Sequence, residues 1–232
     1  MARKYDTFGE VVPDEDVYSA FNKFIFSNDV RVIGKLIQRY NFFKRVKDLP
    51  GDIVELGVFK GSGMASWSKF IELECTYSNK KVIGFDLFDV GNSAMNEFEN
   101  GTAMKAVYDR VQPSDLSLES VKQNLDNMCL TLNRNILVKG DIVHTTKQFR
   151  IDNPGLRISL LYIDVDLCEP TYAGLKNLWD KIIPGGIIVF DEYEYHKFDE
   201  SNGVDKFLKE FDIKYKIVST GALGPTAYMI KE

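Results

Sequence analysis

The chain of 232 residues carries 29 basic and 34 acidic residues, so its formal net charge is −5 at pH 7. Hydrophobic residues make up 44% and charged residues 27%, which is ordinary for a globular protein and excludes a disordered, collagen-like or low-complexity chain. The acidic balance argues against work on nucleic acid or on an anionic membrane, because both partners need a basic surface. The length permits one domain with a sizeable core.

Neither a targeting segment nor a membrane span is visible in the sequence. The N-terminus has a basic start without the apolar region of a signal peptide, and no stretch approaches the roughly 18 apolar residues that span a bilayer. Three scattered cysteines, Cys75, Cys129 and Cys168, form no CxxC pair and favour a reducing compartment over a disulfide framework. We therefore expect a cytoplasmic protein with no membrane and no nucleic-acid partner.

The first fifty residues have the spacing of amphipathic helices. Apolar residues recur at i, i+3 and i+4 over residues 17–26 and again over residues 30–46, and Leu49-Pro50-Gly51 then ends the helical run. We expect residues 1–50 to form a helical N-terminal extension. Its many aromatic side chains would pack in the core or, as alternatives, cover an acceptor or contact a second subunit.

After residue 50, short apolar runs alternate with helical segments. Strands are expected over residues 52–57, 81–86, 135–139, 158–164, 186–191, 214–218 and 227–230. Helices are expected near residues 63–71, 118–130, 172–181 and 203–211. The alternation predicts an α/β fold in one domain over residues 51–232, with a doubly wound, mostly parallel seven-stranded sheet and helices on both faces.

Residues 87–116 have no clear helical or strand period and contain several glycine, asparagine and proline residues. A stretch of this length between a strand and a helix is typical of a lid or a binding loop. We expect this segment to close over a site and to exclude water from it.

Acidic residues fall at or just after the carboxyl ends of five successive predicted strands. They are Glu55, Asp86, Asp141, Asp164 and Asp191. In a doubly wound sheet these ends form one rim, outside which ligands bind. A single aspartate there is commonly a helix cap or a turn residue. Five crowded carboxylates, however, repel one another unless cations or hydroxyl groups offset them.

A glycine-containing turn follows the first strand, from Glu55 through Gly57 to Gly61. Glycines let the backbone approach a ligand closely, and the next helix offers free N–H groups. The gap from Gly57 to Gly61 is too long for the G-x-G-x-x-G motif, which disfavours a dinucleotide oxidoreductase. An acid before the first glycine suits a ligand with an ammonium group better than a pyrophosphate.

Further motifs follow that turn. They are Asp86 with Phe88, Gly140-Asp141, Asp-x-Asp-Leu-x-x-x-Thr from Asp164 to Thr171, Pro184-Gly185-Gly186, and Asp191-Glu192. Together, over residues 50–230, these motifs resemble the class I S-adenosylmethionine (SAM)-dependent methyltransferases, and most closely the macrocin O-methyltransferase family. That family methylates sugar hydroxyls of natural products and uses a divalent metal. The resemblance implies a Rossmann-like domain with an antiparallel C-terminal strand, and suggests a homo-oligomer.

The resemblance also implies which residues bind the cofactor. For SAM these are Glu55 and Gly57 at the methionine part, with Gly61 in the same turn, Asp86 at the ribose hydroxyls, and Asp141 and Ile142 at the adenine. An acid after the second strand has the same ribose-binding role in other nucleotide sites.

A divalent metal is implied on Asp164, Asp191 and Glu192. An all-oxygen ligand set suits Mg²⁺ or another hard cation such as Ca²⁺, and not Zn²⁺. The metal would lower the pKa of a sugar hydroxyl, which is a poor nucleophile near neutral pH. Many relatives, including catechol O-methyltransferase, carry Asp-Asn or Asp-Asp in place of Asp191-Glu192, so the preferred metal stays open.

A general base must also be present. Asp166 is the first candidate, His196 the second and His144 the third, while Asp166 could instead support the metal ligands. The expected function is a SAM- and divalent-metal-dependent O-methyltransferase that acts on a hydroxyl of a sugar or sugar-containing small molecule. A catechol-type O-methyltransferase and a non-catalytic SAM-binding protein are the alternatives.

Overall fold

A seven-stranded sheet forms the centre of the computed structural model, which describes residues 15–89 and 111–232. The strand order is β3-β2-β1-β4-β5-β7-β6, with β1 to β5 parallel and β7 antiparallel to both β5 and β6. The strands are β1 (Asp52–Leu56), β2 (Val82–Asp86), β3 (Asn135–Lys139), β4 (Ile158–Ile163), β5 (Ile182–Phe190), β6 (Val218–Ser219) and β7 (Ala227–Ile230). The expected doubly wound sheet, including its antiparallel C-terminal strand, is confirmed.

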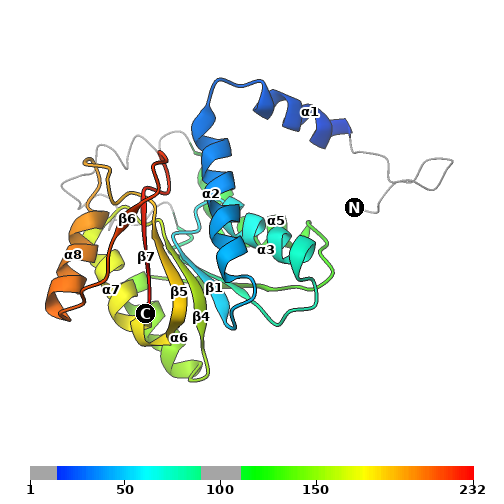
Figure 1. Cartoon of the computed structure of the whole chain (residues 1–232). Coiled ribbons are helices and arrows are strands. Elements are labelled where there is room, and N and C mark those ends of the chain that lie inside the picture. The colour runs from blue at the N-terminus through cyan, green and yellow to red at the C-terminus, as the bar shows by residue number, and fades with distance from the viewer. Residues whose placement is uncertain (1–14, 90–110) are drawn as a thin grey trace.

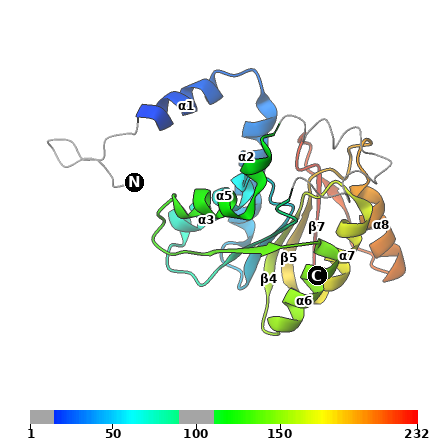
Figure 2. The same cartoon turned by 180° about the vertical axis from the view of Figure 1, so that it is seen from behind.

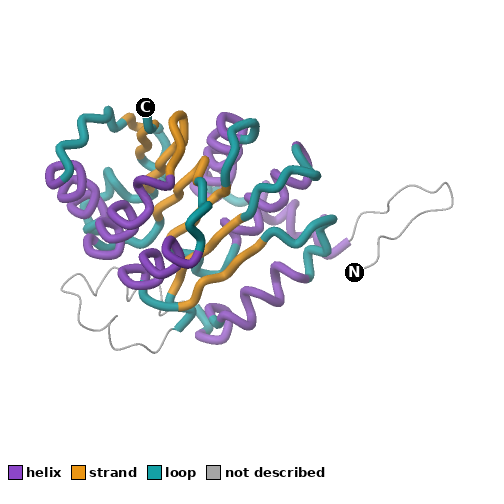
Figure 3. Tube along the Cα trace, turned by 90° about the horizontal axis from the view of Figure 1, so that it is seen from below, coloured by secondary structure: helices purple, strands orange, loops and turns teal. Residues whose placement is uncertain are grey.

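Helices cover both faces of this sheet, as Figures 1 and 2 show from opposite sides and Figure 3 from below. One face carries α2 (Val30–Val46), α3 (Ser62–Glu74) and α5 (Leu118–Asp126). The other carries α6 (Ile142–Asp152), α7 (Cys168–Leu178) and α8 (Glu200–Glu210). The short 3-10 turns η2 (Pro113–Leu116) and η3 (Trp179–Lys181) precede α5 and β5.

Alternation along the strands distributes the core between the two faces. Ile53 on β1 and Leu160 on β4 pack with α2, α3 and α5, whereas Val54 and Leu161 pack with α6, α7 and α8. Residues that follow Ile53 and Leu160 in steps of two therefore face the α2 side. At the carboxyl ends of the strands these residues include Glu55 and Asp164.

Helix α2 contributes to the core through its second half. Phe42, Phe43 and Val46 are buried against α3 and the sheet. Helix α1 (Glu15–Ile25) has no buried residue and projects away from the sheet in Figure 1. Phe21 on α1 is 55% exposed. Core packing of the N-terminal aromatic residues is thus confirmed for α2 and is wrong for α1, and the domain boundary at residue 50 stays a prediction.

Helix α6 has no counterpart among the helices expected from the sequence. Its buried side chains are Ile142 and Thr146, so its apolar periodicity is weak. The helix begins at Asp141, whose carboxylate accepts a hydrogen bond from Val143 N at 2.9 Å. This N-cap aspartate is the sequence signal that could have revealed the helix.

Strands β5 and β6 also differ from expectation. β5 begins at Ile182 and contains the Pro184-Gly185-Gly186 segment, which the sequence places before the strand. Its register with β4 shifts between the pair Ile158–Ile182 and the pair Leu160–Ile187, so this segment is accommodated as an irregularity in the strand. β6 is confined to residues 218–219 instead of 214–218.

Most of the expected lid, residues 90–110, lies outside the described residues. In the described remainder of that segment, Pro113–Leu116 form η2, and Leu116 is buried. Among the helices that the structure describes, none combines the length and the apolar composition needed to cross a bilayer.

Candidate active site

Strand register brings two acids of the rim together. Leu56 on β1 pairs with Ile163 on β4, and Ile163 pairs with Phe190 on β5. One residue further on, Asp164 N donates to Leu56 O at 2.8 Å, and Asp191 N donates to Ile163 O at 3.0 Å. The two aspartates therefore lie side by side, each just after the carboxyl end of its strand, β4 or β5. They are next to the point where the strand order reverses.

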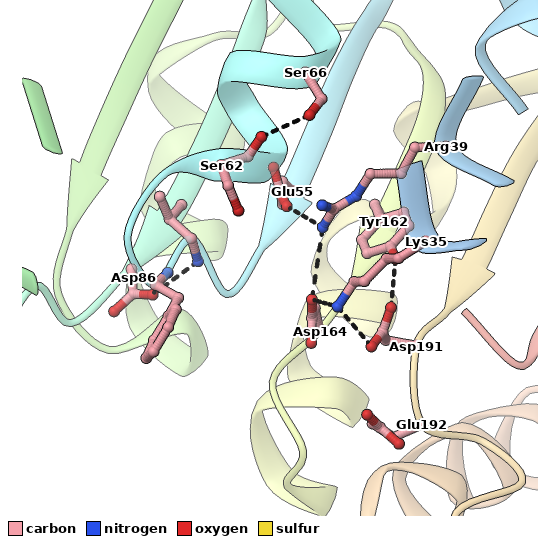
Figure 4. Close-up of polar contacts among 12 residues, drawn as sticks. Lys35, Arg39, Glu55, Ser62, Ser66, Asp86, Tyr162, Asp164, Asp191 and Glu192 are labelled. Atoms are coloured by element: carbon pink, nitrogen blue, oxygen red, sulfur yellow. Dashed lines mark hydrogen bonds and ion pairs between the residues drawn. The ribbon is translucent and has the colours of Figure 1, made fainter. Parts of the chain in front are cut away.

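A lysine from α2 lies between these two aspartates (Figure 4). The Lys35 ammonium donates to Asp164 Oδ2 and to Asp191 Oδ2, both at 2.8 Å. The Asp191 side chain is 3% exposed and the Lys35 side chain 30% exposed. Burial acts to lower the pKa of Lys35, but the charges of Asp164 and Asp191 outweigh it and raise that pKa above its ordinary value. The aspartate pair therefore already holds one full positive charge.

One turn further along α2, Arg39 reaches the same rim. Its guanidinium donates to Glu55 Oε1 at 3.1 Å, and the same nitrogen lies 3.7 Å from Asp164 Oδ2. The guanidinium carbon lies 4.7 Å from the ring centroid of Tyr162, and the Tyr162 hydroxyl donates to Asp191 Oδ1. Two cations from a single helix thus connect the acids of β1, β4 and β5.

Sequence reasoning missed both Lys35 and Arg39. Their spacing of four residues places them on one face of α2, which is the signal available in the sequence. That face also carries Phe42 and Phe43, which are buried against the sheet, so the two cations face the sheet as well. Figure 4 shows them at the carboxyl ends of the strands.

Glu55 is deeply buried, with 1% of its surface exposed. Burial raises the pKa of its carboxyl to about 7, although the neighbouring charge of Arg39 opposes the rise. Among the described residues, Glu55 Oε2 makes no hydrogen bond of normal geometry, although the Trp67 indole N–H lies close enough to act to lower the pKa of Glu55. An ammonium group of a ligand would suit the negative charge of this buried carboxylate. Contact of Glu55 with the methionine part of SAM stays a prediction.

Asp86 braces the turn that follows β1. Its Oδ2 accepts hydrogen bonds from Val58 N at 2.8 Å and Phe59 N at 2.9 Å, and its Oδ1 accepts from Phe88 N at 3.1 Å. Each carboxylate oxygen has about two acceptor sites, so Oδ1 keeps room for another donor. The structure shows a turn-bracing role for Asp86, and its contact with ribose stays a prediction.

The glycines of this turn are required by the chain itself. Gly57 has φ +88°, and a Cβ there would lie 1.9 Å from the carbonyl oxygen of Asp164. Gly61, at the N-cap of α3, has φ +86°, and a Cβ there would lie 3.0 Å from Val121. The close approach of the turn after β1 to the backbone just after β4 explains Gly57 without a ligand, so cofactor contact at both glycines stays a prediction.

At the end of β3, the two adenine-binding candidates have structural roles. Asp141 is exposed and caps α6, and Ile142 is 7% exposed and packs in the core. Their contact with adenine stays a prediction.

The catalytic candidates Asp166 and His196 differ in their surroundings. Asp166 has φ +61°, in the left-handed region that is uncommon for a residue other than glycine, and its carbonyl accepts from Asp199 N. Burial, and then the charges of Asp164 and Asp191, raise the pKa of Asp166 to about 7. His196 is exposed, with its ring centroid 5.8 Å from that of Tyr195.

Glu192 lies beside Asp191 at the rim (Figure 4). Burial, and then the charge of Asp191, raise the pKa of Glu192 to about 8. Its backbone N donates to Glu200 Oε1 at 3.0 Å. Burial is the largest cause of these raised pKa values and the neighbouring carboxylates add to it, so a bound cation would favour the ionised forms.

The chemistry of these acids fits a hard divalent cation. All of the candidate ligands offer carboxylate oxygens, and the ammonium of Lys35 stands in as a cation between two of them. Within residues 15–89 and 111–232, however, no three His, Cys, Asp or Glu side chains are grouped closely enough to hold a metal ion. Mg²⁺ at Asp164, Asp191 and Glu192 therefore stays a prediction.

Comparison with solved structures defines the class of fold. The apo structure of CalS11, a TDP-rhamnose 3′-O-methyltransferase of calicheamicin biosynthesis, superposes with a TM-score of 0.66 and 24% identity over 94% of this chain and 86% of that chain. The O-methyltransferase NovP superposes with a TM-score of 0.69 and 24% identity over 86% of this chain and 80% of that chain. The fold is that of the class I methyltransferases.

Sequence comparison identifies the family within this class. The model of the macrocin-O-methyltransferase (TylF) family matches residues 36–223, and the chain belongs to that family. A curated relative, demethyldecarbamoylnovobiocin O-methyltransferase of Streptomyces niveus, is 27% identical over 176 residues. That match covers 74% of this chain but 63% of the relative, so the chain spans less than two thirds of the relative's length.

Proposed function

We propose that the protein is a SAM-dependent O-methyltransferase that methylates a hydroxyl of a sugar or sugar-containing small molecule with the help of a divalent cation. The observation that carries this proposal is the acidic rim, with the buried Glu55 on one side and the adjacent Asp164 and Asp191 on the other. Family membership supports methyl transfer. The activity of CalS11 on TDP-rhamnose, as that protein is described, supports a sugar as acceptor.

SAM would bind along β1, β2 and β3. When bound, it supplies an electrophilic methyl group. Glu55 would accept hydrogen bonds from the ammonium of the methionine part, and the turn from Gly57 to Gly61 would approach it through its backbone. The ribose hydroxyls would donate to the free acceptor site of Asp86, and Asp141 with Ile142 would contact the adenine. Each of these groups orients the cofactor and so reduces the entropic cost of reaction.

The acceptor would bind on the side of β4 and β5. Asp164, Asp191 and Glu192 would hold a divalent cation, which supplies the Lewis acidity that lowers the pKa of a hydroxyl. Asp166 would take the hydroxyl proton while the oxygen–methyl bond forms and the sulfur–methyl bond breaks, leaving S-adenosylhomocysteine (SAH). His196 is the second candidate for this proton transfer, and Asp166 alternatively supports the cation ligands.

An acceptor panel tests this function. SAH release is measured with nucleoside-diphosphate deoxyhexoses, glycosylated aromatic natural products and catechol, each with Mg²⁺ or with EDTA. We expect turnover with a sugar acceptor and its loss in EDTA. Turnover with catechol alone would favour the catechol-type alternative, and SAH binding without turnover on any acceptor would favour a non-catalytic protein.

A pair of variants locates the reaction. Asp164→Asn should abolish turnover and leave SAH affinity nearly unchanged, because the side chain lies on the acceptor side of the rim. Asp212→Asn is the matched control, since its side chain is 84% exposed beyond α8. Turnover that persists in EDTA, or in Asp164→Asn, would remove the metal from the proposal while leaving methyl transfer in place.

A homo-oligomer and a cytoplasmic location complete the proposal. The first rests on the family resemblance, and the second on the three scattered cysteines. Light scattering on the purified protein measures the oligomeric state.

A further inference from the structure

The Lys35 ammonium occupies the gap between the two aspartates that the proposed function assigns to a divalent cation (Figure 4). Its Nζ contacts Asp164 Oδ2 and Asp191 Oδ2, at 2.8 Å in each case. Arg39 stands beside this pair but is directed to Glu55, at 3.1 Å, and is 3.7 Å from Asp164. Lys35 is therefore the cation that the aspartate pair shares. It also precedes residue 36, where the match to the family model begins, so its role does not follow from that match.

An ammonium and a divalent cation would compete for these two oxygens. A Mg²⁺ ion lies about 2.0–2.1 Å from each carboxylate oxygen that it binds. An ammonium that kept its own contact with the same oxygens would then lie within a few ångströms of the metal. Repulsion between like charges at that separation in a partly buried site is strong. Binding of the one cation therefore weakens binding of the other.

The position of Lys35 on α2 gives this exchange a structural consequence. The buried residues of α2 are Arg39, Phe42, Phe43 and Val46, all in its second half. In the first half, Val30 is 69% exposed and Val32 is 57% exposed. The two ion pairs of Lys35 are thus contacts that hold the lightly packed first half of α2 onto the ends of β4 and β5.

We propose that Lys35 is a resident counter-cation of the Asp164–Asp191 pair, that a divalent cation displaces it by competing for the same oxygens, and that this displacement releases the first half of α2 from the rim. The proposal rests on the metal site of the proposed function and adds a competitor for that site. Lys35 is a positioning residue here: it offsets the charge of the two aspartates while no metal is bound, and it lowers the apparent affinity for the metal.

Metal affinity is the direct test. Binding of Mn²⁺ and of Mg²⁺ to the full chain with SAH present is measured by calorimetry for the unmutated protein, Lys35→Met and Lys35→Gln. Because each variant removes the competing charge, we expect both to bind metal about tenfold or more tightly than the unmutated protein. Lys44→Met is the matched control: it removes a cation from the same helix that pairs with Glu74 at 3.5 Å, away from the rim, and should leave metal affinity unchanged.

Backbone hydrogen exchange tests the release of α2. In the unmutated protein, Mg²⁺ should increase exchange over residues 31–38 and leave residues 42–46 protected. In Lys35→Met, exchange over residues 31–38 should be raised already and should not respond to Mg²⁺. Lys35→Gln serves if the methionine variant does not fold, since its amide keeps a polar contact without the charge.

The outcomes separate this proposal from the proposed function. Equal or weaker metal binding by both Lys35 variants overturns the competition, while metal-dependent turnover would still stand. Exchange over residues 31–38 that does not respond to Mg²⁺ overturns the release of α2. If none of the proteins binds metal although all bind SAH, both this proposal and the metal site are rejected, and the SAH site survives.

Discussion

Arg39 on α2 lies over the ring of Tyr162 on β4, with 4.7 Å between the guanidinium carbon and the ring centroid. The side chain of Arg39 is 8% exposed and that of its partner Glu55 is 2% exposed. The ring face and the carboxylate therefore replace much of the water that the guanidinium loses when α2 packs on the sheet. Because the Tyr162 hydroxyl donates to Asp191, the Arg39–Tyr162 contact adds to the direct ion pairs that connect α2 to the acidic rim.

Removing Arg39 should destabilise the fold. Arg39→Met leaves Glu55 buried without its cation, and breaking one partner of a buried pair typically costs about 3–5 kcal/mol. We expect a loss of about that size in the free energy of unfolding at pH 8, measured by urea denaturation. The loss of stability should be smaller at pH 5. Because burial raises the pKa of Glu55 to about 7, its carboxyl is neutral at pH 5 and does not need the charge of Arg39.

The double variant Arg39→Met/Glu55→Gln controls for the lost packing of the arginine. It removes both charges, so it should recover part of the stability that Arg39→Met loses. If the double variant is no more stable than the single one, packing and not charge accounts for the effect.

Asp86→Ala should weaken SAH binding. The variant loses the proposed acceptor for the ribose hydroxyls and also the acceptor of the backbone N–H groups of Val58, Phe59 and Phe88. Hydrogen bonds to a charged group contribute about 1.5–3 kcal/mol, so we expect roughly a 10- to 100-fold loss of affinity by calorimetry. Asp86→Asn keeps one carbonyl acceptor and should lose less. SAH affinity equal to that of the unmutated protein would show that Asp86 braces the turn without contacting the cofactor.

Gly57→Ala should lower stability sharply. The new Cβ would lie 1.9 Å from the Asp164 carbonyl oxygen, and the φ of +88° is unfavourable for alanine. We expect a loss of at least about 2 kcal/mol in the free energy of unfolding, because backbone on both sides must shift. Gly34→Ala is the control within α2, where nothing lies within 4 Å of the added Cβ, and it should stabilise the protein slightly. A thermal melt of both variants compares them directly, and similar melting temperatures would refute the steric argument.

The sheet and its acidic rim could be predicted because both follow from local patterns. Short buried strands are nearly continuous apolar runs, and an acid after such a run must lie at the carboxyl edge of a parallel sheet. The contacts of Lys35 and Arg39 with this rim could not be predicted from local patterns. In the sequence, 129 residues separate Lys35 from Asp164, and their contact depends on how α2 packs on the sheet. The sequence did not predict α6, because the apolar periodicity of residues 142–152 is weak. It also did not predict the first half of β5, because that half contains a proline and two glycines.

Glu74 at the end of α3 should make the packing of α2 sensitive to acid. Its carboxylate accepts hydrogen bonds from the Tyr40 hydroxyl and from Lys47 Nζ, the latter at 3.1 Å, and these contacts lower the pKa of Glu74 to about 2. A carboxyl whose pKa is lower in the folded protein binds fewer protons there than in the unfolded chain, so stability falls as the pH falls. The contribution of Glu74 is present above its unfolded pKa of about 4.3 and is lost as the pH approaches 2.

Glu74→Gln should therefore be less stable than the unmutated protein at pH 7, with the difference shrinking between pH 4.5 and pH 2. Urea denaturation across that range measures it, with Glu119→Gln, at an exposed position on α5, as the control. A difference that does not change with pH would show that the ion pairs of Glu74 do not stabilise the contact between α2 and α3.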